Sequence, residues 1–185
     1  VEDDNSDELE LPKDYGVNDF PLVVQDRTFD ADNQFDYAGT YNPDGTYGDT
    51  LLINGTINPY VEVTNELVRL RLVNGSNARN YTFGLENGAV FNQIASDGGF
   101  LEQPVALTSV TLTPGERAEI IVDLSEYAEG DTAKLMDGDV TVLSLNVTEE
   151  TDAQTALPQT LNEITELTTE GAAVQRFTLS GMSFM

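Results

Sequence analysis

The stretch Val68-Arg-Leu-Arg-Leu-Val73 decides the fold, because apolar and polar side chains alternate along it with a period of two. Side chains of a β-strand point to opposite faces in turn, so the first, third and fifth residues share one face, and Arg69 and Arg71 lie on the other. The pattern therefore predicts a strand with one face in a hydrophobic core. We expect the two arginines to form ion pairs, because the chain has 33 acidic residues against 8 basic ones.

Strand-like runs recur on both sides of this stretch, with Gly, Pro and Asn turn signals between them. Residues 80–85 and 90–95 flank Asn87-Gly88, which is the signature of a β-hairpin. Helical periodicity is weak except over residues 159–167. The sequence predicts an all-β fold, a Greek-key β-sandwich or barrel. The predicted strands are residues 21–24, 51–53, 60–63, 68–73, 80–85, 90–95, 105–112, 118–123 and 140–147, with a short one near 35–37 in the loop 30–49.

Composition divides the chain into four parts. Residues 1–18 are acidic and polar, and we interpret them as an interdomain lead-in. Residues 19–148 hold the predicted strands and form one domain. Residues 149–172 are polar and Thr-rich, which is typical of a linker. Residues 173–185 begin with another strand-like run, which predicts the first strand of a following domain.

Missing residue types limit the chemistry of the chain. It has no His and no Cys, so imidazole bases, thiolate nucleophiles and their metal sites are excluded. We predict no catalytic residue, no cofactor-binding residue and no metal ligand. The net charge of −25 opposes nucleic-acid binding. No run approaches the roughly 20 apolar residues of a membrane span.

The long loop carries a weak resemblance to a calcium site. Asp30, Asp32, Asn33 and Asp36 supply oxygen atoms, but the Gly and the closing Glu of a calcium loop are absent at the required spacing. A solvated turn is the interpretation that we favour.

Three tyrosines of the same loop, Tyr37, Tyr41 and Tyr47, could contact an aromatic substrate. Aromatic residues in such loops more often pack over a sheet edge, so we expect packing. Arg117 is expected to pair with a carboxylate, and Asn74 and Asn77 to shape the loop after their strand.

Several segments together resemble one known family. They occur in family order between Phe20 and Leu124, and their number and order make the signal specific. The core is similar to the second cupredoxin-like domain of bacterial multicopper oxidases, the group of spore-coat laccases and copper-efflux oxidases. The segments are FPLVVQDRTF (20–29), GDTLLING (48–55), PYVEV (59–63), VRLRLVNGSNAR (68–79), IASDGGFL (94–101) and LTPGERAEIIVDL (112–124).

The resemblance implies a protein of three cupredoxin domains, with type 1 copper in the third and a trinuclear cluster between the first and third. The second domain usually holds no copper, so the missing His and Cys fit it, and no copper ligand is carried over. The implied partners are the flanking cupredoxin domains of the same chain. The parent would couple one-electron oxidation of phenols or metal ions to reduction of dioxygen to water, while this fragment would be non-catalytic. An extracytoplasmic or cell-envelope setting is implied by the resemblance alone.

Two alternatives stay open. Some relatives keep the three-domain fold without copper and act as structural proteins of the cell envelope, and a second domain looks alike in both groups. The chain could also be an independent acidic module that binds cations. The neighbouring sequence separates the first two, since His-x-His pairs and a Cys–His stretch indicate an oxidase.

Overall fold

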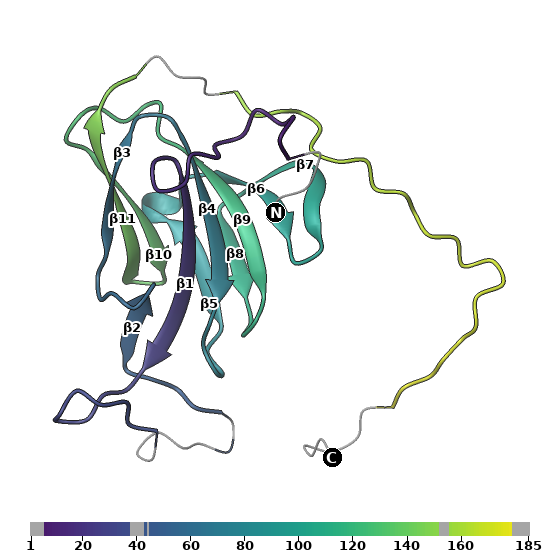
Figure 1. The fold of residues 1–185 in the computed structure, drawn as a ribbon, viewed down its shortest axis with the longest axis horizontal. Helices are drawn as coiled ribbons and strands as arrows, with labels where there is room; N and C mark the ends of the chain where they lie inside the picture. The colour runs from purple at the N-terminus through teal and green to yellow at the C-terminus, as the bar shows by residue number, and fades with distance from the viewer. Residues whose placement is uncertain (1–5, 38–42, 44, 152–155, 179–185) are drawn as a thin grey trace.

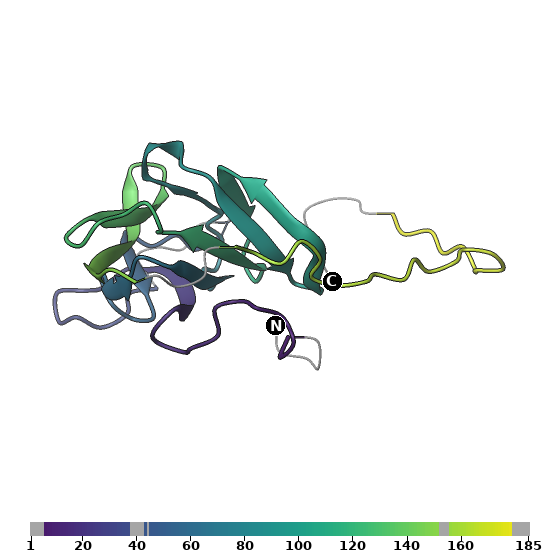
Figure 2. The ribbon, with the colours of Figure 1, turned by 90° about the horizontal axis from the view of Figure 1, so that it is seen from above.

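The computed structural model describes residues 6–37, 43, 45–151 and 156–178. Two β-sheets face each other and enclose the main hydrophobic core (Figures 1 and 2). The prediction of an all-β sandwich is confirmed. The elements are β1 (Asp19–Arg27), β2 (Thr50–Ile53), β3 (Tyr60–Thr64), β4 (Leu67–Asn74), β5 (Tyr81–Leu85), the short 3-10 helix η1 (Glu86–Gly88), β6 (Phe91–Ser96), β7 (Gly99–Leu107), β8 (Ser109–Leu112), β9 (Arg117–Asp123), β10 (Thr132–Asp137) and β11 (Val140–Glu149).

Strand order shows how the chain crosses between the sheets. The six-stranded sheet has the order β2-β1-β4-β9-β6-β7, and the five-stranded sheet has the order β3-β11-β10-β5-β8. Two pairs are parallel, β1 with β4 and β3 with β11, and the others are antiparallel. Leu70 of β4 lies opposite Phe20 on one side and Ile120 on the other. The predicted strand 68–73 therefore lies near the middle of the six-stranded sheet.

The main core lies between the sheets, and the apolar face of β4 contributes to it as predicted. Val68, Leu70 and Leu72 are fully buried. On the opposing sheet Tyr81 and Phe83 stack with ring centroids 5.6 Å apart. Large apolar side chains interdigitate here because both sheets turn one face inward.

A second cluster lies on the outer face of the six-stranded sheet. Leu11 of the lead-in and Leu161 of the C-terminal segment pack there against residues of β4, β6, β7 and β9. Ala118 to Val122 of β9 are buried at every position, since the strand has the core on one face and this cluster on the other. The cluster comprises Leu11, Leu67, Ile94, Ala95, Phe100, Ile121 and Leu161, with Leu9 and Leu157 at its margin.

The predicted hairpin of residues 80–85 and 90–95 is wrong. β5 pairs with β8 and β10 in the five-stranded sheet, whereas β6 pairs with β7 and β9 in the six-stranded one. Asn87 has a φ of 64°, so the Asn-Gly signal marks a tight connection between the two sheets. β5 buries its apolar side chains in the main core, whereas β6 buries Phe91 there and Ile94 and Ala95 in the second cluster. The sequence pattern of two apolar runs around an Asn-Gly pair is the same for a hairpin and for a crossover between sheets.

Three smaller expectations also differ from the structure. The run 105–112 is divided between β7 and β8, which belong to different sheets, and β10 was not predicted. Near 35–37 only an isolated bridge between Phe29 and Phe35 forms. Residues 174–178 are exposed and have no strand pairing in the part of the chain described. The four-part division at 18, 148 and 172 remains a prediction. No helix in the described part is long and apolar enough to cross a bilayer.

Candidate functional site

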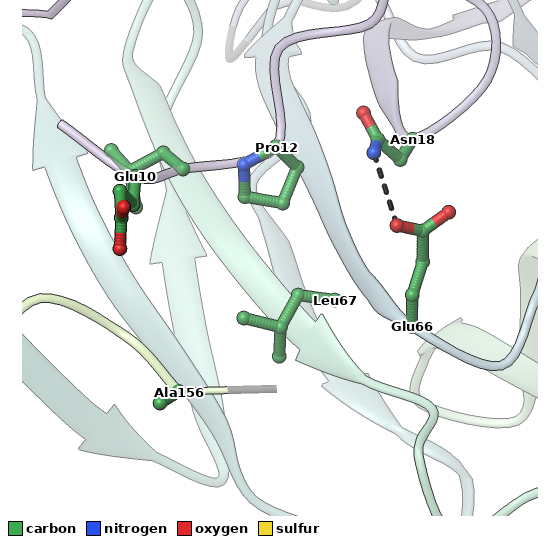
Figure 3. A pocket seen from close by; sticks show the side chains of 7 residues that line it. Glu10, Pro12, Asn18, Glu66, Leu67 and Ala156 are labelled. Carbon is green, nitrogen blue, oxygen red and sulfur yellow. Dashed lines mark hydrogen bonds between the residues drawn. The ribbon is translucent and has the colours of Figure 1, made fainter. Parts of the chain in front are cut away.

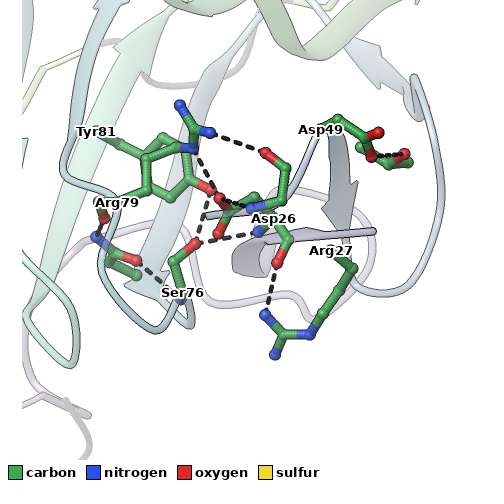
Figure 4. A network of polar contacts seen from close by, with 9 residues as sticks. Asp26, Arg27, Asp49, Ser76, Arg79 and Tyr81 are labelled. Atoms are coloured by element: carbon green, nitrogen blue, oxygen red, sulfur yellow. Dashed lines mark hydrogen bonds and ion pairs between the residues drawn. The ribbon is translucent and has the colours of Figure 1, made fainter. Parts of the chain in front are cut away.

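A buried polar network joins the end of β1 to the loop before β2 and to the connection after β4 (Figure 4). Oδ2 of Asp26 accepts hydrogen bonds from Nε of Arg79 at 2.8 Å and from the backbone N–H of Gly48 at 2.7 Å. Nη2 of Arg79 also donates to the carbonyl of Gly48 at 2.8 Å. These bonds close a ring that fixes the loop to the body of the sandwich.

Ser76 extends this network toward the core. Its Oγ accepts a hydrogen bond from the backbone N–H of Asp26 at 3.1 Å and lies 2.8 Å from the hydroxyl of Tyr81. Asn74 shapes the connection as predicted, because its side chain donates to the carbonyls of Arg79 and Leu112 and accepts from the N–H of Ser76. The network is therefore a structural joint made of side chains from several of the motif segments.

The network shifts the pKa values of its members in opposite directions. Burial by itself would raise the pKa of Asp26, but the proximity of the Ser76 hydroxyl and the hydrogen bonds from Arg79 and Gly48 outweigh it and hold the pKa below the ordinary 3.8. The hydrogen bond to Asp26 raises the pKa of Arg79 against the effect of burial. Burial raises the pKa of Tyr81 to about 12. Asp26 and Arg79 thus form a stable ion pair at neutral pH. The shifts move the pKa values of all three side chains away from neutral pH, which does not suit general acid–base catalysis.

Gly48 is required at the centre of this joint. A Cβ atom at this position would lie 2.3 Å from the backbone nitrogen of Arg27, so only glycine allows the loop to approach β1. Beside it, the Arg79 guanidinium lies 5.6 Å from the ring centroid of Tyr47, close enough for a cation–π contact.

Ion pairs hold the outer face of the six-stranded sheet, as predicted for both arginines of β4. Arg69 pairs with Glu119 of β9, with 2.9 Å between Nε and Oε2, and Arg71 pairs with Asp19 of β1, with 2.8 Å between Nε and Oδ1. The expected pairing of Arg117 is confirmed by its 3.1 Å contact with Asp97. All three arginines pair with carboxylates of this chain, so none of them indicates a binding site for an external anion.

The lead-in closes over Arg69, whose side chain is 3% exposed. Its guanidinium lies 5.6 Å from the ring centroid of Phe100, and its Nη1 donates to the carbonyl of Pro12 at 3.5 Å. A cavity of about 190 Å³ lies next to this contact (Figure 3). The lead-in residues Glu10, Leu11 and Pro12 line it together with Asn18, Glu66, Leu67 and Ala156. Sequence reasoning missed this arrangement, because single leucines in polar segments give no periodic signal.

The calcium-like loop is a self-contained turn. Oδ1 of Asp30 accepts hydrogen bonds from the N–H groups of Asp32 and Gln34, both at 2.9 Å. Asn33 has a φ of 58°, which Asn tolerates in turns. This oxygen of Asp30 therefore stabilises the turn through backbone hydrogen bonds, and the absence of a calcium site in the loop stays a prediction.

The two loop tyrosines that the structure describes each contact a neighbouring side chain and remain partly exposed, and their packing over a sheet edge stays a prediction. Tyr37 lies beside Phe35, with ring centroids 6.2 Å apart, and Phe35 stacks on Phe29 at 5.2 Å. Tyr47 contacts Arg79. Tyr41 lies outside the described residues.

The residues of this chain do not fit a copper centre. Copper sites in proteins use imidazole and thiolate ligands, and the chain has neither. Within the described residues no group of three or more carboxylates is placed to hold a metal ion. That the chain has no catalytic, cofactor or metal residue of its own remains a prediction.

Similar proteins place this domain in a family. Residues 18–133 match the family described as multicopper oxidase. The cell division protein FtsP of Proteus mirabilis is 49% identical over 142 residues, which cover 74% of this chain and 30% of that protein. The multicopper oxidase mco of Staphylococcus haemolyticus is 44% identical over 140 residues, which cover 76% of this chain and 31% of that protein.

Solved structures agree with the sequence relatives. A multi-copper oxidase from Pediococcus acidilactici superposes with a TM-score of 0.86 at 40% identity, covering 91% of this chain and 35% of that one. The McoA multicopper oxidase from Aquifex aeolicus superposes with a TM-score of 0.84 at 36% identity, covering 95% of this chain and 41% of that one. This confirms the cupredoxin-like fold class. The chain spans about a third of the length of the curated relatives that it matches, and it belongs to the multicopper oxidase family.

Proposed function

We propose that this chain is the copper-free middle domain of a three-domain multicopper oxidase and acts as a scaffold. The parent protein oxidises phenols or metal ions one electron at a time and reduces dioxygen to water. The middle domain sets the spacing of its two neighbours and takes no part in electron transfer.

One observation carries this proposal. The chain has the fold and sequence of the family over about a third of a full-length relative, yet contains no His or Cys. Three arginines, Arg69, Arg71 and Arg79, form ion pairs with buried carboxylates of the same chain. Such a domain can position other domains but cannot supply imidazole or thiolate ligands to copper.

A second candidate is favoured by one group of relatives. Several matches between 44% and 49% identity are named cell division protein FtsP. Under this alternative the parent is a multicopper-oxidase-like scaffold protein of the cell envelope, without copper.

Copper titration of the isolated chain tests the scaffold assignment. We expect no blue absorption band and no oxidation of a methoxyphenol after addition of Cu(II). A tight stoichiometric copper site in this chain would contradict the assignment. The longer gene product separates the two candidates, because metal analysis of the purified full-length protein shows copper for an oxidase and none for the envelope scaffold.

The spacing role needs its own test in the full-length oxidase. Residues 19–149 are replaced by a Gly/Ser linker that is long enough to span the same distance. We expect turnover to be lost, because the linker no longer fixes the relative positions of the neighbours. Turnover close to that of the unmodified protein would show that the middle domain is dispensable for spacing.

A further inference from the structure

Two segments from opposite ends of the chain share one binding surface. Leu11 of the lead-in is 7% exposed and Leu161 of the C-terminal segment is 1% exposed, although both lie in polar sequence. Both pack on the patch formed by Leu67, Ile94, Ala95, Phe100 and Ile121 on the outer face of the six-stranded sheet. Each segment therefore shields from water some of the same apolar residues that the other segment contacts.

Polar contacts fix where each segment lies. The carbonyl of Pro12 accepts from Arg69, which is held by Glu119 and covered by Phe100. The N–H of Leu161 donates to the carbonyl of Glu102 on β7 at 2.8 Å. Phe100 and Glu102 belong to the same strand, so both segments are anchored to β7 or to residues in contact with it.

The cavity of Figure 3 shows the two segments close together. Glu10, Leu11 and Pro12 form one wall, Ala156 another, and Leu67 lies between them. Leu67 is 5% exposed, and it belongs to the same apolar cluster as Leu11 and Leu161. Removal of either wall would place water against Leu67 and the apolar residues beside it.

We propose that residues 6–18 and 156–161 form a clasp, two segments that bind the outer face of the six-stranded sheet cooperatively. The position of whatever precedes the domain is thereby coupled to the position of whatever follows it. This inference rests on the proposed scaffold function for its biological meaning. The coupling itself is a property of this chain and is tested on this chain alone.

Cooperativity follows from the shared patch. When one segment detaches, the apolar contacts that it made with common residues are lost, and the other segment binds a partly hydrated surface. Coupling between sites in proteins typically changes affinity by roughly 5- to 150-fold, and it is reciprocal. Removal of the Leu161 side chain should therefore loosen the lead-in, and removal of Leu11 should loosen the C-terminal segment by a similar factor.

The lysines of the chain provide a specific assay. Lys13 lies in the lead-in and Lys134 in β10, and the chain has no other lysine. A lysine-specific endoprotease needs several residues of extended, accessible chain around the cut. Cleavage after Lys13 thus reports detachment of the lead-in, and cleavage after Lys134 reports unfolding of the sandwich.

The variant Leu161→Ser tests the coupling. We expect cleavage after Lys13 to be at least about fivefold faster than in the unmodified chain, with Lys134 protected in both. The control Leu167→Ser changes a residue that is 92% exposed, so it should leave the rate unchanged. A rate for Leu161→Ser within twofold of the unmodified chain would overturn the proposal.

A second variant covers the case in which Leu161→Ser unfolds the domain and exposes Lys134. Leu157 lies at the margin of the same cluster, so Leu157→Ser perturbs the segment more gently. Faster cleavage after Lys13 supports the clasp, and unchanged cleavage contradicts it. In the reciprocal experiment, Leu11→Ser should speed hydrogen exchange of the Leu161 amide by the same factor. Failure of these tests would leave the copper-free scaffold assignment intact, because that assignment depends on copper titration and the full-length protein.

Discussion

Replacement of Asp26 by Ala should destabilise the domain strongly, because it opens the joint between β1 and the loop before β2. The change removes two hydrogen bonds to a buried carboxylate, one from Arg79 and one from the N–H of Gly48. Hydrogen bonds to charged groups contribute about 1.5–3 kcal/mol each. The Arg79 side chain is 39% exposed, so water solvates the cation that remains. We therefore expect the free energy of unfolding to fall by about 3 kcal/mol, which is the lower bound for two such bonds.

Urea unfolding of the 185-residue chain measures this loss as a shift of the midpoint at constant slope. The matched control is Asp97→Ala, which removes the exposed partner of Arg117 and should cost at most about 1 kcal/mol. If both alanine variants lose the same stability, the buried network is not the joint described above.

The pH dependence of the free energy of unfolding gives an independent check of the role of Asp26, and its sign follows from the direction of the pKa shift. The folded pKa of Asp26 lies below the ordinary 3.8, so the unfolded chain binds more protons between these two values. The stabilisation by the ionised carboxylate is complete above pH 3.8 and disappears as the pH falls through the folded pKa. Asp26→Asn should therefore be less stable than the unmodified chain at neutral pH, and the gap should narrow only below pH 3.8. A gap that narrows near pH 6 would refute the reasoning.

Three further substitutions probe other contacts by the same unfolding assay. Gly48→Ala should cost about 1–3 kcal/mol or more, since the Cβ of the new alanine would collide with the backbone of Arg27. Stability equal to that of the unmodified chain would show that the loop can move away from β1. Arg69→Met alone removes the cation that pairs with the buried carboxylate of Glu119 and should cost about 3–5 kcal/mol, whereas the double variant with Glu119→Leu should be nearly neutral. Equal losses of stability in both variants would contradict this reasoning. Tyr81→Phe should cost about 0.5–1.5 kcal/mol through the lost contact with Ser76, and it should remove a tyrosine ionisation near pH 12 from the absorbance titration.

The sequence was informative where one face of a strand is buried and the other is polar. Alternation located β4 and assigned Arg69 and Arg71 to the outer face, and the surplus of acidic residues predicted their ion pairs. Apolar periodicity is weak on β7, an edge strand with one buried residue and a proline at position 104. On β10 a register shift after Leu135 interrupts the alternation, which explains why this strand was missed.

Pairing between strands and contacts of the lead-in could not be predicted for a different reason. β5 and β6 both contain buried apolar residues but belong to opposite sheets, and the local sequence does not determine which sheet a strand joins. Arg79 and Gly48 belong to separate motif segments, and only the fold brings them onto Asp26. Leu11 and Leu161 are isolated apolar residues, so their burial depends on a surface that is assembled from four strands.

The parallel pairing of β3 with β11 has a consequence for the kinetics of folding. β3 lies in the first half of the chain, but among the described strands of the five-stranded sheet it pairs only with β11, which is the last of them in the sequence. Val61 of β3 pairs with Leu145 of β11, so the hydrogen bonds between these strands form only when both segments are present. Contacts between residues so far apart in the sequence slow folding. During synthesis the N-terminal half therefore exposes an unpaired strand edge until residue 149 has emerged from the ribosome, and we expect this interval to be when the protein is most prone to aggregate.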